Sequence, residues 1–323
     1  MKQSRLDLNL STKKTRKQEL LAQMELVVPW GALVELIAPY YPEGKNGRPP
    51  FALQTMLRIH CMQQWFDLSD LGMEEAFFDT PVYREFAQLD ANGRLPDEST
   101  ILRLRHRLEK HKLAQEMFKT VNALLEQRGL ILRSGTLVDA TLIAAPSSTK
   151  NKDKARDPEM HQTQKGKQWY HGMKAHTGTD AHFGLVHTLR CTAANVHDVV
   201  EANSLLHGDE TDVFADAGYQ GADDRPDAVQ GKRWHIAMKR SKRKALDQSK
   251  PRGQLLEQLE QVKSRIRAKV EHPYRVLKCQ FGYVKVRYRG LMKNAQQLHT
   301  LFALGNLWTV RRLLLQEPLG RFA

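Results

Sequence analysis

Apolar residues in the first part of the chain recur every three to four positions, which is the spacing of amphipathic helices. This pattern predicts a helix from Gln18 to Ile37 that breaks or kinks at Pro29. After a turn-rich stretch over 40–50, the same spacing predicts helices over these ranges: 51–66, 71–78, 81–86 and 113–128. Gly129 is suited to end the last of them, so an all-helical region is expected up to this point.

After the helical region, short runs of β-branched and apolar residues predict strands. The expected strands occupy the ranges 136–143, 169–180, 184–193, 211–219 and 235–238. The second and third form an antiparallel pair, and a polar, basic loop over 145–168 precedes them. Asp198 is expected to cap a short helix over 199–206, and an amphipathic helix over 294–315 is expected to cover the sheet. Together these features predict an α/β domain over 131–323.

A long helix is predicted to begin near Gln254 and to continue to Lys278. Its apolar residues fall on one stripe: Leu255, Leu259, Val262, Ile266, Val270 and Leu277. Arg267, Glu271 and Lys278 lie at i, i+4 and i+11, which places them together on a different face. On an ideal helix Glu271 lies more than about 90° from the centre of the stripe. We expect Pro273 to kink the helix and to swing this acid inward.

The charge of the chain indicates what kind of partner it binds. Its 323 residues carry a formal net charge of +14, with a pI near 9.7, which favours a polyanionic partner. No apolar run has the length of a membrane-spanning helix, and residues 1–17 are polar and basic, so we expect no membrane association and no secretory signal. Cys61, Cys191 and Cys279 are scattered and support neither a disulfide framework nor a zinc knuckle. A cytoplasmic protein is expected.

Three acidic residues are distinguished by their surroundings. Asp139 lies within an apolar, β-branched run, where a carboxylate is rare unless it is paired or bound to metal. The solvated face of a half-buried strand is its plainer alternative. Asp216 ends a strand just before Gly218, which allows a tight turn, and a simple turn residue is the alternative. Glu271 lies between cations on its helix face, where a salt-bridged surface residue is the alternative.

Two aspartates from strands and one glutamate from a later helix are the ligands that a two-metal phosphoryl-transfer site requires. Hard Mg²⁺ ions prefer oxygen ligands, and a pair of them can activate the attacking oxygen and stabilise the leaving one. The neighbouring Arg267 and Lys278 would hold the phosphate backbone of a nucleic acid, and Lys174 is a further candidate for a phosphate contact. Histidines cluster nearby, but His171 and His176 fall on opposite faces of their strand and no thiolate accompanies them, so zinc is not expected.

A second basic surface is predicted in the helical region. After Pro96, a helix carries Arg103, Arg105 and Arg107, while its apolar residues face inward. The recognition helix of a helix-turn-helix would look like this in a major groove, and an ordinary helix with a solvated basic face is the equal alternative. The basic run over 239–252 is likewise expected to contact a nucleic-acid backbone.

The order of the elements after the helical region is that of an RNase H-like domain, in which the two Asp-bearing strands lie side by side. With these residues assembled, the chain resembles the DDE transposases of bacterial insertion sequences. The branch it is similar to is named after insertion sequence five, within the insertion-sequence four/five group. The resemblance is carried by residues 56–63, 95–101, 135–141, 215–221 and 267–274 with Lys278. The last motif is similar to the family's Tyr-(2)-Arg-(3)-Glu-(6)-Lys signature, with Ser264 at the Tyr position.

The resemblance implies a fold and a division of the chain. The fold is α/β, with an RNase H-like mixed-sheet catalytic domain preceded by an all-helical N-terminal DNA-binding domain. The implied parts are a basic arm with a leading helix (1–46), the helical DNA-binding domain with a connecting helix (47–130) and the catalytic domain (131–323).

The resemblance also implies an activity. DNA would be cleaved at the terminal inverted repeats of the element, and the 3′-OH ends would be joined to target double-stranded DNA. Asp139, Asp216 and Glu271 would bind two Mg²⁺ ions, for which Mn²⁺ can substitute, and Arg267 and Lys278 would position phosphate or the terminal base pairs. A homodimer is expected because two ends must be held together, in a cytoplasmic, nucleoid-associated setting in a bacterium.

Two other functions stay open at this point. An RNase H-like nuclease would use the same three acids without strand transfer. A non-catalytic DNA-binding regulator would leave the three acids far apart or dispensable, with binding confined to residues 1–115. An inactive copy of an element is a third reading, against which the presence of all three acids argues.

Overall fold

A computed structural model describes residues 13–44, 48–90, 92–152 and 154–316. The first twelve residues of the predicted basic arm lie outside these ranges. The helices before the sheet are α1 (Arg16–Val27), α2 (Trp30–Ile37), α3 (Leu53–Phe66), α4 (Asp70–Asp79), α5 (Pro81–Phe86), α6 (Glu98–Lys110) and α7 (Leu113–Gln127). The predicted helical region is therefore confirmed, and the break at Pro29 separates α1 from α2.

A mixed sheet follows the helices. Its strands are β1 (Gly135–Ala144), β2 (His161–Lys165), β3 (Gln168–Asp180), β4 (Val186–Ala193), β5 (Asp212–Ala215) and β6 (Arg233–Ile236). Among the described residues the order is β2-β3-β1-β5-β6, with β4 also paired to β3. β1 is antiparallel to β3 and parallel to β5, and β5 is parallel to β6. The α/β fold, with a helical region followed by a mixed sheet, agrees with an RNase H-like domain as expected.

Two expectations for the sheet region were wrong. β2 lies within the stretch 145–168 that was predicted to be a loop, and it pairs with the end of β3 as an antiparallel edge strand. Its residues are mostly exposed, so no apolar alternation marks it in the sequence. The helix expected over 199–206 is reduced to α8 (Asp198–Glu201) and a 3₁₀ turn, Asn203–Leu205. Asp198 begins α8 instead of capping it, and its carboxylate is paired with Lys174 at 2.9 Å.

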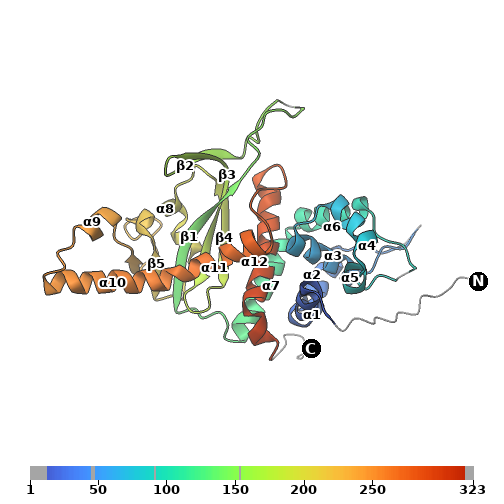
Figure 1. The fold of residues 1–323 in the computed structure, drawn as a ribbon, viewed down its shortest axis with the longest axis horizontal. Helices are drawn as coiled ribbons and strands as arrows, with labels where there is room; N and C mark the ends of the chain where they lie inside the picture. The colour runs from blue at the N-terminus through green and yellow to red at the C-terminus, as the bar shows by residue number, and fades with distance from the viewer. Residues whose placement is uncertain (1–12, 45–47, 91, 153, 317–323) are drawn as a thin grey trace, which may run out of the picture.

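The C-terminal part of the chain covers the sheet and joins it to the helical region. It contains α9 (Arg240–Lys244), α10 (Pro251–Arg267), α11 (Glu271–Arg275) and α12 (Leu291–Leu314). α12 packs against both β4 and α7, as Figure 1 shows at the centre of the molecule. One hydrophobic core runs from α1 through α12 to the sheet. The predicted covering helix is thus confirmed, and it also contacts the helical region.

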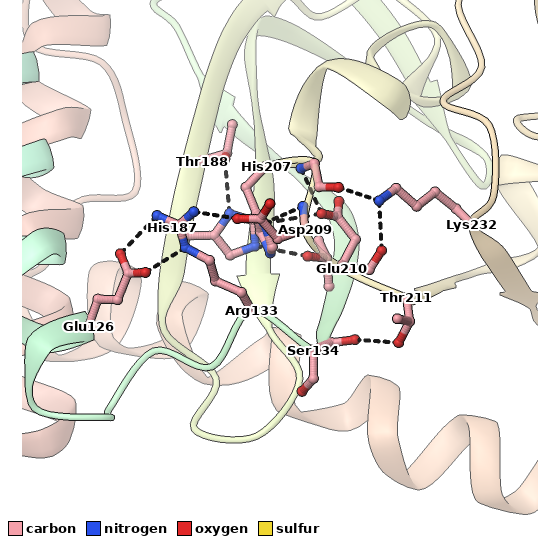
Figure 2. A network of polar contacts seen from close by, with 12 residues as sticks. Glu126, Arg133, Ser134, His187, Thr188, His207, Asp209, Glu210, Thr211 and Lys232 are labelled. Atoms are coloured by element: carbon pink, nitrogen blue, oxygen red, sulfur yellow. Dashed lines mark hydrogen bonds and ion pairs between the residues drawn. The ribbon is translucent and has the colours of Figure 1, made fainter.

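A polar network fixes the end of the sheet where β1 and β5 begin (Figure 2). Arg133 donates to Glu126 at 3.0 Å and also pairs with Asp209, so it ties α7 to the loop before β5. In the same network His187 contacts the ring of His207, with ring centroids 4.8 Å apart. The chain leaving this end is therefore held in a fixed register before it reaches Asp139 in the middle of β1 and Asp216 just after β5.

Among the described residues, no single helix is long and apolar enough to cross a membrane. α1 and the segment Trp30–Tyr40, bent by 69°, reach that length and composition only as a pair.

Candidate active site

Asp139 and Asp216 come from neighbouring parallel strands. β1 pairs with β5, and the last paired residues are Leu137 and Phe214. Asp139 lies two residues after Leu137, and Asp216 lies two residues after Phe214. Because side chains alternate between the two faces of a sheet, this register carries both carboxylates to the same level on one face.

One oxygen of each aspartate accepts a backbone hydrogen bond. Asp139 Oδ1 accepts from the N–H of Ala140 at 2.9 Å, and Asp216 Oδ1 accepts from the N–H of Gly218 at 2.8 Å. Asp216 caps a 3₁₀ turn in this way, so its predicted turn role and its predicted site role are compatible. Both side chains are half-buried, and each keeps a second oxygen for a ligand.

Glu271 enters from a helical segment that is not continuous. The predicted long helix divides into α10, a 3₁₀ turn (Ala268–Val270), α11 and a π-helical turn (Val276–Gln280). Glu271 is the first residue of α11, directly after the 3₁₀ turn. Tyr274, buried in the same element, shares a hydrogen bond of 2.6 Å with the hydroxyl of Thr177 on β3. The irregular turns and this anchor place Glu271 at the sheet, which an ideal helix would not do.

All three acids line one pocket of about 460 Å³. The other residues that line it are Ala140, Thr141, Lys165, Arg267, His272, Tyr274, Arg275, Lys278 and Cys279. Acidic side chains from β1, from the residue after β5 and from α11 therefore face the same space as four lysine and arginine side chains and one histidine. The sequence prediction that separate segments bring these residues together agrees with this arrangement.

The pKa of the Asp139 carboxyl is shifted by burial and by the charges around this pocket. Burial raises its pKa from 3.8 to about 7, the Ala140 N–H and Arg267 lower it, and the charges of Asp216 and Glu271 raise it further. The three carboxylates therefore repel one another across the pocket, which is the condition that a bound cation relieves. Oxygen ligands of this kind suit Mg²⁺ or Mn²⁺. Within the described ranges, however, no three acidic, histidine or cysteine side chains converge tightly enough to form a ready-made metal site.

The two predicted basic partners lie beside the acids. Arg267 is half-buried, and its Nη1 atom is buried without a hydrogen-bond partner among the described residues. Such an unpartnered guanidinium nitrogen suits an incoming phosphate oxygen. Lys278 donates to the Thr141 hydroxyl at 2.6 Å and to the Leu142 carbonyl at 3.0 Å. Burial, together with the charge of Lys165, lowers the pKa of Lys278.

Two other predicted DNA contacts are turned into the protein. Lys174 is 15% exposed and pairs with Asp198 at 2.9 Å. Arg105 is 11% exposed, pairs with Asp70 and Glu109 at 2.9 Å each, and lies over the ring of Tyr288. Both charges are already compensated, so neither side chain is presented to a DNA backbone in this structure.

Arg103 and Arg107 lie differently from Arg105, although they share α6. Arg103 is exposed, and Arg107 donates to the Tyr40 carbonyl at 2.6 Å. Both line a second pocket of about 630 Å³ between α6 and residues 41–44 and 48–51, and Arg48 and Arg94 also line it. The basic surface of the helical region is therefore centred on the start of α6 and the segment before α3.

The sequence prediction missed several residues of the pocket. Lys165 lies in the unpredicted strand β2, and Thr141 is an uncharged strand residue two positions after Asp139. Tyr274 carries a signal that could have been used, because it follows Glu271 by three residues and so lies on the same side of a helix. Ser264, at the predicted Tyr position, is exposed on α10 and donates to the Glu260 carbonyl at 2.8 Å, so it does not line the pocket.

Comparison with known families matches most of the chain. Residues 131–307 match the family described as "Transposase DDE domain". Residues 8–107 match the family described as "Transposase domain (DUF772)". The first match spans the sheet, the acid-lined pocket and much of α12, and the second spans α1 to most of α6.

Proposed function

This chain belongs to the DDE transposases, and we propose that it mobilises a bacterial insertion sequence of the insertion-sequence-five branch. As a member of this family it is a phosphoryl-transfer enzyme that acts on DNA. The proposed reaction is cleavage at the terminal inverted repeats of the element, followed by transfer of the 3′-OH ends into target DNA. The observation that supports it most is the single pocket lined by Asp139, Asp216 and Glu271.

In this proposal the three acids bind the divalent metal that DDE transposases generally use. Their oxygen atoms fit Mg²⁺, with Mn²⁺ as a substitute. Burial, and to a lesser extent the charges of Asp216 and Glu271, raise the pKa of Asp139, and a cation between the acids would relieve this cost of ionisation. Two bound ions would activate the attacking oxygen and stabilise the leaving oxygen of the phosphodiester. The three carboxylates would hold the two metal ions at one place, supported by the strands β1 and β5.

The basic residues of the chain would orient the DNA. Arg267 offers a buried guanidinium nitrogen to a phosphate, while Lys278, held by the Thr141 hydroxyl, places a second positive charge in the same pocket. Arg103 and Arg107 on α6 would contact the backbone of the terminal repeat at some distance from the cut. These contacts set the register of the duplex and carry most of the salt-dependent affinity.

We further propose a homodimer that holds two element ends, in a cytoplasmic setting. Each end needs one set of acids, and strand transfer of both ends to one target requires that the two pockets be held in a fixed relation. A dimer meets this need with one repeated surface.

The test is strand cleavage and joining on a labelled duplex that carries the terminal inverted repeat. Wild type is compared with Glu271→Gln in Mg²⁺ and in EDTA. Glu19→Gln, an exposed residue in the first turn of α1, is the matched control because it makes the same change away from the pocket. DNA binding is measured in parallel by electrophoretic mobility.

We expect nicking and joining by wild type and Glu19→Gln only in the presence of metal, and neither activity in Glu271→Gln although it still binds the duplex. Cleavage without joining would support an RNase H-like nuclease that uses the same pocket. Binding without cleavage by any of the proteins would support a DNA-binding regulator and contradict the proposal.

A further inference from the structure

The outer part of α10 turns its apolar side chains to solvent. Leu255, Leu259 and Val262 are 57%, 49% and 50% exposed. They belong to the stripe that the sequence predicts, but only the later part of that stripe (Val270 and Leu277) is buried. Figure 1 shows α10 extending away from the sheet, on the side opposite the helical region, with α9 beside it.

The opposite face of α10 is polar and contacts the rest of the protein. Glu257 pairs with Arg243 of α9 at 2.6 Å. Glu260 is 3% exposed and accepts from the N–H of Met238 at 2.8 Å. At Gly253 an added Cβ would lie 2.0 Å from the Asp247 carbonyl oxygen, so the start of the helix is packed closely on the preceding loop. The orientation of α10 is thus fixed, with its charged face inward and its apolar face outward, the reverse of a helix that covers a core.

The exposed stripe has the spacing of a helix-pairing seam. Leu255, Leu259, Val262 and Ile266 are separated by four, three and four residues, which is the alternation of the a and d positions in a coiled coil. The first three are exposed, whereas Ile266 is half-buried and also packs against the hydrophobic core. An antiparallel pair of α10 helices places Leu259 of one copy against Val262 of the other, and Leu255 against Ile266. Each apolar residue of the seam then meets an apolar residue of the second copy.

The charges beside the seam are compatible with self-pairing. In the same antiparallel register, Arg265 faces Gln258 of the second copy and Lys263 faces Leu256, so no like charges meet beside the seam. The Lys263 ammonium is turned back to Glu260 at 2.8 Å. An antiparallel pair also directs the two protein bodies to opposite ends of the paired helices.

We propose that a second copy of this chain docks on the Leu255–Leu259–Val262 face of α10 as an antiparallel helix pair. The proposal deepens the proposed function, because it names the surface that would join the two copies. α10 leads directly to Arg267 and Glu271, so pairing at this helix fixes the two acid-lined pockets relative to each other. The helix is about 25 Å long, and a pair of such helices buries less than the about 800 Å² per partner of a standard interface. The dimer is therefore expected to dissociate at micromolar concentrations.

The test is the mass of the full chain in solution without DNA, measured by sedimentation across micromolar concentrations. The seam variant carries Leu259→Glu with Val262→Glu. The matched control carries Gln254→Glu with Gln261→Glu, which adds the same charge at exposed positions of α10 outside the seam. Circular dichroism checks that both variants are folded, which is expected because all four side chains are exposed.

We expect a concentration-dependent dimer for wild type and the control, and a monomer for the seam variant at every concentration. A wild type that stays monomeric, or a dimer that persists in the seam variant, would overturn the proposal.

The orientation of the two helices is tested by disulfide cross-linking in a Cys279→Ser background. A mixture of Leu259→Cys and Val262→Cys chains should cross-link more than either chain alone, and equal cross-linking would contradict the antiparallel register. The mass does not depend on cleavage, so failure of the proposed activity and failure of this interface are distinguishable.

Discussion

The carboxyl of Asp139 combines burial with two like charges, and this has a consequence for stability. Its pKa is raised to about 7 in the folded protein, against 3.8 in an unfolded chain. A raised carboxyl pKa means that the folded state binds its proton more tightly, so stability is lost as the pH rises from about 4 through about 7. In the absence of metal, the ionised residue is therefore a source of instability at pH 8.

We predict that Asp139→Asn stabilises the metal-free protein at pH 8 and has little effect near pH 4. Each pKa unit corresponds to about 1.4 kcal/mol, which sets a ceiling of about 4 kcal/mol. We expect about 2 kcal/mol, because water enters the pocket and screens the charges. Urea unfolding in EDTA at the two pH values measures the effect, with the exposed Asp223→Asn as control. A variant that is less stable than wild type at pH 8 would contradict the electrostatic reading of the pocket.

Among single residues, the sequence allowed the three acids of the pocket to be predicted, but not the surroundings of every basic residue. Asp139 and Asp216 are recognisable because an apolar strand rarely contains an acid without a reason. Arg105 and Lys174 were expected to contact DNA, but in the structure both are paired with acidic residues. Their partners, Asp70 and Asp198, come from other elements, and the pairing depends on packing that no local pattern shows.

The segment from α10 to the π-helical turn is the element on which the site depends most. The sequence predicts one helix, in which a kink at Pro273 turns Glu271 toward the acid pair. In the structure the helix type instead changes on both sides of α11, and Pro273 lies within α11. Local periodicity fixes which residues share a face of a regular helix, but a change of helix type rotates the later faces, and that change is set by contacts with the sheet.

The Tyr274–Thr177 hydrogen bond is predicted to hold α11 to β3. Tyr274→Phe removes the hydroxyl and leaves the buried Thr177 without its 2.6 Å partner. We expect a loss of about 1–2 kcal/mol in the free energy of unfolding. Tyr170→Phe is the control, because the Tyr170 hydroxyl bonds the exposed Gln168 in the β2–β3 hairpin and its loss should change stability by less than about 0.5 kcal/mol. Equal effects in urea unfolding would show that the Tyr274 bond is not a structural anchor.

The whole molecule is organised around α12, which touches both the helical region and the sheet. Asn306, 1% exposed, joins three elements: its Oδ1 accepts from the Val186 N–H at 2.9 Å, and its amide donates to the Val186 carbonyl at 2.7 Å and to Asn122 on α7 at 2.8 Å. The sequence predicted that this helix covers the sheet, but its second contact, with α7, could not be read from periodicity, because α12 is buried over most of its length.

Asn306→Leu is therefore predicted to weaken the packing of the helical region against the sheet. The change leaves the buried Val186 N–H without its acceptor, while the Val186 carbonyl keeps only the Asn122 amide at 3.1 Å, which should cost about 1–3 kcal/mol of unfolding free energy. Urea unfolding followed by tryptophan fluorescence and by circular dichroism measures it, with the exposed Asn195→Leu as control. An effect no larger than that of the control would mean that the two regions are held together without this contact.

The central claim is that Asp139, Asp216 and Glu271 act as one metal site, and Mn²⁺ binding tests it most directly. Calorimetric titration of wild type is compared with Asp139→Asn, Asp216→Asn, Glu271→Gln and the control Glu19→Gln. We predict Mn²⁺ binding by wild type and the control, and an affinity lower by about tenfold or more in each of the three pocket variants. An unchanged Mn²⁺ affinity in any of the three would contradict the claim, because that acid would then not be a ligand.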